Sequence, residues 1–81
     1  MIWLLACASA PSDQDRYIQS TTADRAEAAG ICTAIADDTL RSDCLIHAAA
    51  RHAREGDITA AQATCQTIDA GIWRDECWFL T

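Results

Sequence analysis

Cysteines are the residues of this sequence whose type and spacing point to specific chemistry. Four of the five form two pairs with eleven residues between the partners, Cys32 with Cys44 and Cys65 with Cys77. Five cysteines in 81 residues are typical of a protein that folds in an oxidising compartment. The sequence therefore predicts two disulfide bonds, and Cys7 is left over.

The spacing of the pairs also constrains local structure. Residues twelve positions apart on one helix are separated by about 18 Å along its axis, too far for a disulfide. Helix breaks at Asp37-Asp38 and Ala70-Gly71 would instead place the two partners on facing helices. Because the spacing repeats, we favour one bond within each pair. Each bond would then close a 13-residue loop and contribute about 3 kcal/mol of stability.

A second connectivity stays open at this point, with Cys44 bonded to Cys65 and Cys32 bonded to Cys77. It resembles the outer–outer, inner–inner pairing of the mitochondrial twin CX9C helical hairpins. The present sequence has eleven residues rather than nine between the cysteines of each pair.

The two pairs belong to an internal repeat, because residues 24–48 align with residues 57–81 at an offset of 33. Four identities fall between the cysteines of each pair: Cys32 with Cys65, Ile35 with Ile68, Arg41 with Arg74 and Cys44 with Cys77. Asp24 with Asp57 and Ala28 with Ala61 precede them. The period is close to that of tetratricopeptide repeats. That resemblance lies in the period and the helical-pair design, and it implies stacked hairpins that present a surface to peptides or proteins.

Composition and periodicity favour an all-α fold of four short helices, arranged as two tandem disulfide-stapled hairpins. The chain has 17 alanines and no valine, which favours helix over sheet. The expected helices are residues 23–35, 38–54, 58–68 and 72–80, with Gly56 ending the second by a glycine stop. The hairpins then span about 23–55 and about 57–81, within a helical-repeat domain at 21–81. The fourth helix is shorter than its counterpart, so either the coding sequence is partial or Trp78-Phe79-Leu80 cap the open end of the core.

The N-terminal stretch Leu4-Leu5-Ala6-Cys7 resembles the lipobox of bacterial lipoproteins. The resemblance implies cleavage before Cys7, acylation of that residue, and an outer-membrane lipoprotein facing the periplasm or the outside. Residues 1–6 would then be a truncated signal-like segment, and residues 7–20 a lipid-anchored polar tether. Only six residues precede Cys7 and none is basic. Either the true start lies upstream, or the run is not a signal and the protein is secreted without lipid or keeps a free thiol.

Charge excludes one class of partner. The net charge of −6 and the absence of lysine argue against nucleic-acid binding, which depends on neutralising phosphates. Arg41 and Arg74 recur at equivalent positions, each followed by acidic residues. Either they belong to a pattern in which acidic residues occupy the first turn of a helix, where carboxylates are favourable, or they form a candidate interaction surface with Trp73 and Trp78.

Catalytic and metal-binding patterns are weak. Cys44 and His47 have a spacing that can chelate zinc, but the second repeat has Leu80 where the first has His47. The sequence carries no C-x-x-C motif, serine–histidine–acid constellation or glycine-rich phosphate loop. We therefore expect no enzyme activity, no cofactor and no metal.

Two functions follow from these patterns. The first is a lipid-anchored structural or protein-interaction module of the bacterial envelope, bound to the membrane through Cys7 and to an envelope protein or peptide. Short helical units with this cysteine spacing also resemble repeats in bacterial lipoproteins, which implies no activity. The alternative is a small secreted metal- or redox-carrier that depends on its cysteines.

Overall fold

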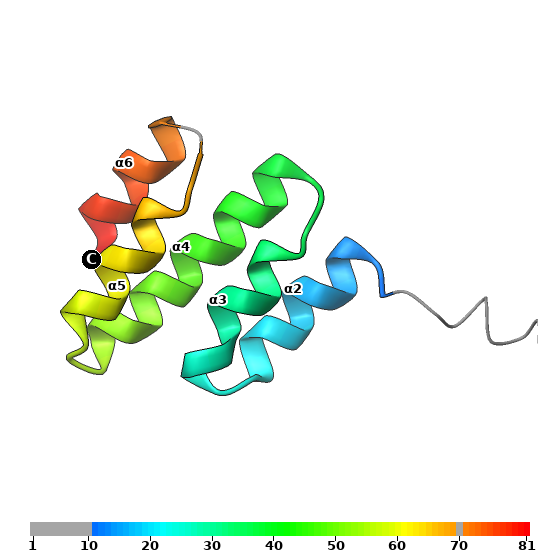
Figure 1. Ribbon diagram of the computed structural model, residues 1–81, viewed down its shortest axis with the longest axis horizontal. Helices are drawn as coiled ribbons and strands as arrows, with labels where there is room; N and C mark the ends of the chain where they lie inside the picture. Colours follow the sequence, from blue (N-terminus) through cyan, green and yellow to red (C-terminus); the bar gives the residue numbers. More distant parts are fainter. Residues whose placement is uncertain (1–10, 70) are drawn as a thin grey trace, which may run out of the picture.

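The computed structural model describes residues 11–69 and 71–81, and all regular structure in this part of the chain is helical. Five helices follow one another, as Figure 1 shows: α2 (Asp13–Thr22), α3 (Arg25–Thr33), α4 (Asp38–Arg54), α5 (Ile58–Gln66) and α6 (Gly71–Leu80). The all-α prediction is confirmed. The predicted count of four helices is wrong, because α2 occupies most of the segment expected to be a polar tether.

Local capping explains where α2 begins and why it is a helix. The Ser12 side chain accepts a hydrogen bond from the backbone N–H of Asp15, and the Asp15 carboxylate accepts one from the N–H of Ser12. This reciprocal capping box satisfies two donors that a helix start leaves unpaired. A polar segment with this start signal can form a helix when a neighbouring surface holds it.

Caps also set the ends of the other helices. The Asp37 carboxylate accepts from the N–H of Leu40 at 2.8 Å, and that of Asp57 accepts from the N–H of Ala60 at 3.1 Å. Gly56 has a φ of 84°, and the N–H groups of Gly56 and Asp57 bond the carbonyls of Ala53 and His52. These two bonds form a Schellman motif, which requires a left-handed residue at its centre. The predicted glycine stop is confirmed.

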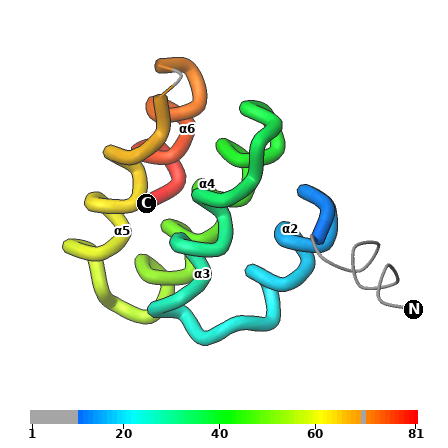
Figure 2. The backbone as a smooth tube through the Cα atoms, turned by 45° about the vertical axis from the view of Figure 1, so that its right-hand side comes forward, coloured from blue at the N-terminus to red at the C-terminus, as the bar shows by residue number. Residues whose placement is uncertain are grey.

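The helices form two layers, and α4 lies in one layer and packs against both helices of the other. Helices α2, α4 and α6 lie side by side in one layer, and α3 and α5 cover them from the other side, as Figure 2 shows. Helix α4 contacts each of the other four described helices. The starts of α3 and α5 are 33 residues apart (25 and 58), and so are those of α4 and α6 (38 and 71).

Both disulfide bonds lie in the core, so the prediction of disulfides is confirmed. Cys32 is bonded to Cys44, and Cys65 to Cys77, with Cα–Cα distances of 5.5 and 5.6 Å. All four cysteines are at most 2% exposed. The remaining core is aliphatic and mostly small: Ala28, Ile35, Leu45, Ile46, Ala48, Ala49, Ala61 and Ile68. Covalent staples therefore contribute much of what a larger apolar core would otherwise supply.

The side chain of Arg25 ties the start of α3 to the turn between α4 and α5. Its guanidinium lies 3.0 Å from Asp57 Oδ2, 3.1 Å from Glu55 Oε1 and 3.0 Å from His52 Nδ1. Because a guanidinium only donates, Nδ1 of the buried His52 must accept, which assigns the proton to Nε2. The pKa of Asp57 is lowered, first by the hydrogen bond that its carboxylate accepts from the Ala60 N–H and then by the hydrogen bond from Arg25.

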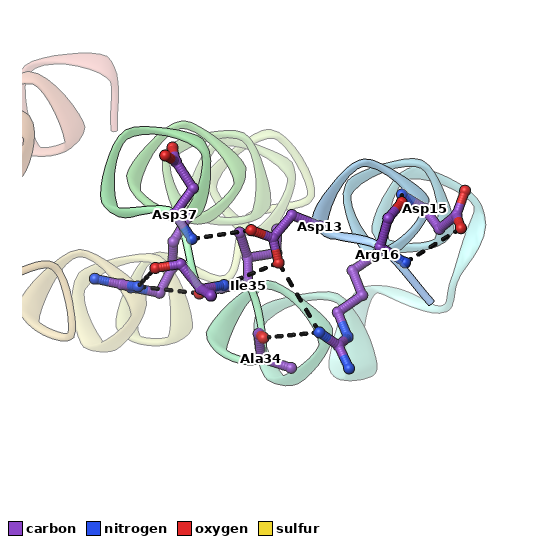
Figure 3. Close-up of polar contacts among 9 residues, drawn as sticks. Asp13, Asp15, Arg16, Ala34, Ile35 and Asp37 are labelled. Atoms are coloured by element: carbon purple, nitrogen blue, oxygen red, sulfur yellow. Dashed lines mark hydrogen bonds and ion pairs between the residues drawn. The ribbon is translucent and has the colours of Figure 1, made fainter. Parts of the chain in front are cut away.

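Polar side chains hold both ends of α2 against the rest of the molecule. At its start, the Asp13 carboxylate accepts from the N–H groups of Ala36 and Asp37, both at 3.0 Å, which lowers the pKa of Asp13 (Figure 3). At its end, Arg51 of α4 donates to the carbonyls of Ser20 at 3.0 Å and Ala23 at 2.9 Å. These contacts give α2 a fixed position beside α3 and α4.

Candidate functional site

A groove of about 340 Å³ runs between α2 and α4, with α3 beneath it. Its lining comes from three helices: Tyr17, Ser20, Thr21, Ala28, Cys44, His47, Ala48, Arg51 and Arg54. The side chains between α2, α3 and α4 at this place are small, among them Ser20, Ala28 and Ala48, so they leave space between the helices.

The floor of the groove consists of small side chains that are themselves buried. Ala28, Cys44 and Ala48 are 2%, 2% and 3% exposed, and Ser20 is 6% exposed. The Ser20 hydroxyl lies 2.6 Å from the Tyr17 carbonyl and 3.2 Å from the Cys44 sulfur. Since the sulfur is in a disulfide and carries no proton, the hydroxyl is the donor and its single proton goes to one acceptor at a time. The floor is thus narrow and largely apolar.

One wall of the groove holds an aromatic and acidic network. The Tyr17 hydroxyl donates to Asp43 Oδ2 at 2.5 Å, and His47 Nε2 lies 3.6 Å from the same oxygen. The Tyr17 and His47 rings meet edge to face, with centroids 6.3 Å apart. Burial, followed by the hydrogen bond to Asp43 and its negative charge, raises the pKa of Tyr17 to about 12. Tyr17 is therefore a neutral hydrogen-bond donor at physiological pH.

The cationic side of the groove comes from α4. Arg51 uses its guanidinium to cap α2, so its charge is already partnered by backbone carbonyls. Arg54 lies one turn further along, is exposed, and makes no ion pair with any residue in 11–69 or 71–81. The groove combines an apolar floor with an uncommitted cation at its mouth.

The cysteine and the serine of the lining are both already bonded. The cysteine in the lining is disulfide-bonded and has no thiolate to attack a substrate. The Ser20 hydroxyl donates to a carbonyl or sulfur acceptor, so no base in the groove accepts its proton. What the groove offers a ligand is an apolar slot, a tyrosine and a histidine on one wall, and the Arg54 guanidinium.

The two arginines singled out by the sequence have the same structural role in their respective units. Arg41 Nη1 donates to the Ile35 carbonyl at 3.0 Å, and Arg74 Nη1 donates to the Ile68 carbonyl at 3.3 Å. Each arginine therefore satisfies a carbonyl in the turn that follows the preceding helix, two residues after the end of that helix. These contacts give the recurrent arginines a structural role that neither alternative in the sequence analysis included, and the interaction surface stays a prediction.

The predicted interaction residues are not brought together around the groove. Trp73 is half-buried and packs against the core, while Trp78 is 38% exposed on α6. Arg41 borders a smaller hollow of about 200 Å³ with Asp38, Ser42 and Asp69. None of the four predicted residues lines the α2–α4 groove.

The groove residues were missed by sequence reasoning for a definable reason. Asp43, His47, Arg51 and Arg54 form a polar stripe along α4 that helical spacing makes visible. Tyr17 gave no signal, because its segment was expected to be an unstructured tether.

Other predicted features are placed as follows. Cys7 lies outside the described residues, so its lipidation stays a prediction. Cys44 is disulfide-bonded and His47 pairs with Asp43, so these two are not a zinc pair. Within residues 11–69 and 71–81 no group of three His, Cys, Asp or Glu side chains could hold a metal ion. Among the same residues, no helix combines the length and hydropathy of a membrane span.

The described residues define an all-α, disulfide-stapled helical protein with a small surface groove. Comparisons with protein-family models, with curated proteins and with solved structures found no match to this chain.

Proposed function

We propose that this protein is a lipid-anchored interaction module of the bacterial cell envelope, and that its α2–α4 groove binds a segment of another polypeptide. The observation that carries the binding part is the groove itself, with an apolar floor at Ala28 and Ala48 and an unpaired Arg54 at its mouth. The fixed position of α2 supports a preformed site, which lowers the entropy that binding has to overcome.

The location rests on separate support. Two core disulfides fit an oxidising compartment such as the periplasm. The stretch Leu4-Leu5-Ala6-Cys7 resembles a lipobox, and acylation there would tether the helices to a membrane surface. The shared offset of 33 residues supports two tandem hairpin repeats, α3–α4 and α5–α6, preceded by α2 as an additional covering helix.

The chemistry of the lining indicates the class of peptide. An apolar side chain would enter the slot above Ala28 and Ala48, and a carboxylate beside it would pair with Arg54. The neutral Tyr17 hydroxyl, held by Asp43, sits at the wall where a peptide backbone would pass. We therefore expect ligands with an acidic residue next to a large apolar one.

A displayed random-peptide library tests the groove directly. Selection on the purified protein should enrich peptides of the acidic–apolar type, and Arg54→Ala should weaken the affinity of the best peptide at least roughly tenfold. Gln62→Glu, on the exposed side of α5, changes the net charge by the same amount away from the groove and serves as the control. Binders that tolerate Arg54→Ala as well as the control would exclude this site.

Anchoring is tested independently. The natural gene with its upstream region, expressed in a bacterium, should incorporate labelled palmitate into the protein, and Cys7→Ser should abolish the label. Absence of label from the wild type would remove the lipid anchor from the proposal and leave the peptide-binding groove standing.

The alternative of a metal- or redox-carrier has no specific observation in its favour. All four cysteines of the described residues are in buried disulfides. We therefore propose only the interaction function.

A further inference from the structure

Helix α6 carries a large apolar surface that the rest of the described chain does not cover. Ile72 is 76% exposed and Phe79 is 85% exposed, with Trp78 at 38% and Leu80 at 50% beside them. Side chains of this size are normally buried, and a group of them on one helix marks an interaction surface. Most of the Phe79 side chain and half of the Leu80 side chain therefore lie outside the core.

The exposed apolar residues share their helix face with two carboxylates. Ile72, Asp75, Glu76 and Phe79 stand at i, i+3, i+4 and i+7, which places them on one side of α6. Both acids are exposed, and neither forms an ion pair with any described residue. The basic residue of the same helix, Arg74, is bound to the Ile68 carbonyl. We refer to these four residues as the α6 face.

Two of the four positions of the α6 face have buried counterparts on α4. At the offset of 33, Ser42 corresponds to Asp75 and Ile46 to Phe79, whereas Thr39, the counterpart of Ile72, is exposed and Asp43, the counterpart of Glu76, accepts a hydrogen bond from Tyr17 of α2. Ser42 and Ile46 lie about 160–200° round the helix from Cys44, so they are on the side of α4 turned away from its disulfide to α3. They are only 5% and 4% exposed. The α6 face is thus placed to receive a packed helix, but it has a carboxylate where α4 has a hydroxyl.

The carboxylate of Asp75, in place of the Ser42 hydroxyl, determines which kind of partner can pack on the α6 face. A helix packed on α6 as α5 packs on α4 would bury Asp75, and burying a carboxylate without a cationic partner is costly. A second copy of this chain would bring the same acidic face and another net charge of −6. A partner with lysine or arginine beside its apolar stripe would pair with Asp75 and Glu76 while covering Ile72 and Phe79. We propose that the α6 face docks a cationic amphipathic helix of another protein, separately from the α2–α4 groove.

A defined probe tests this docking. A 15-residue amphipathic peptide of leucine and lysine, fluorescently labelled and without tryptophan, is titrated with the protein and followed by anisotropy. The wild type should bind it, and Phe79→Ser should weaken binding at least roughly fivefold through lost apolar contact. Asp75→Lys with Glu76→Lys should weaken it more than roughly tenfold. Phe79 is exposed, so its substitution should leave the circular dichroism and melting temperature unchanged.

The matched control separates a specific face from general attraction to an acidic protein. Asp24→Lys with Glu27→Lys makes the same change in net charge at the exposed start of α3. We expect this control to retain most of the affinity. Equal losses in the two double variants, or binding unaffected by Phe79→Ser, would overturn the proposal. Self-association of the wild type that Phe79→Ser abolishes, measured by sedimentation without peptide, would assign the face to a second copy instead and would also overturn it.

Discussion

Single side chains in this protein mostly serve to satisfy backbone groups that short helices leave unpaired. Arg41, Arg51 and Arg74 all donate to carbonyls at helix ends, and Asp13 accepts from N–H groups at the start of another segment. Helices of nine or ten residues have a large share of unpaired ends, so this use of charge is expected. Residues that are not used in this way, such as Arg54, then stand out as available for a ligand.

Tyr17 provides a direct optical test of the groove wall, because it is the single tyrosine of the sequence. Its absorbance change at 295 nm should titrate near pH 12 rather than near 10.0, the ordinary value. Asp43→Ala should bring the pKa part of the way back, since burial is the larger cause and remains. Asp75→Ala, on α6, should have no effect. A wild-type titration near pH 10 would mean that Tyr17 neither is buried against α4 nor bonds Asp43.

Asp57 gives a prediction for acid stability. Its pKa in the folded protein is below the ordinary value of 3.8, so the charged form stabilises the fold above that pH. The contribution is lost as the pH falls from about 4 through the lowered pKa of the folded state. Asp57→Asn should therefore be less stable than the wild type in urea unfolding at pH 7, with a difference that shrinks below pH 4. A difference that stays constant down to pH 2 would contradict a charge-based role.

At the scale of elements, α2 shows where sequence patterns stop being informative. The boundaries of α4 and the start of α5 could be predicted because the break at Asp37-Asp38 and the glycine stop at Gly56 are local signals, whereas α5 ends at Gln66, two residues before the predicted end. Helix α2 has a local start signal too, but its polar sequence gives no apolar stripe long enough to predict docking. Its position depends on contacts such as Arg51 to Ser20, 31 residues apart, which no local pattern carries. The groove was therefore beyond sequence reasoning.

Hydrogen exchange tests the docking of α2. Arg51→Met removes both bonds to the end of the helix, and amides in residues 13–22 should then exchange at least roughly tenfold faster. Arg54→Met is the matched control, because Arg54 lines the same groove one turn away and makes no bond to α2. Amides of α5 should be unaffected in both variants. Equal protection of α2 in wild type and Arg51→Met would show that these bonds do not hold it.

The molecule as a whole combines a small core with two covalent staples. The predicted all-helical class and the disulfides followed from composition and from cysteine spacing, which are global features of the sequence. The positions of the uncovered surfaces could not be predicted from these features, because they depend on which helix faces pack against a neighbouring helix. Two separate surfaces result, a cationic groove between α2 and α4 and an acidic apolar face on α6.

Reduction of the disulfides should abolish the folded state at the scale of the whole molecule. Each bond closes a 13-residue loop and contributes about 3 kcal/mol in the chain-entropy model, so the pair is comparable to the stability of a small domain. Circular dichroism in urea, with and without dithiothreitol, measures the loss. Replacing either pair by alanine should remove about half of it. A reduced protein that melts at the same urea concentration would show that the core suffices without staples.

The central claim is that the α2–α4 groove is where this protein binds a polypeptide. It is tested most directly by titrating the ¹⁵N-labelled protein with a peptide that has an acidic residue next to leucine, taken from the library selection. The account predicts that the largest amide shifts fall on Tyr17, Thr21, Ala48 and Arg54, and that Arg54→Ala removes them. Shifts concentrated on α5 and α6, or spread evenly over the chain, would contradict it.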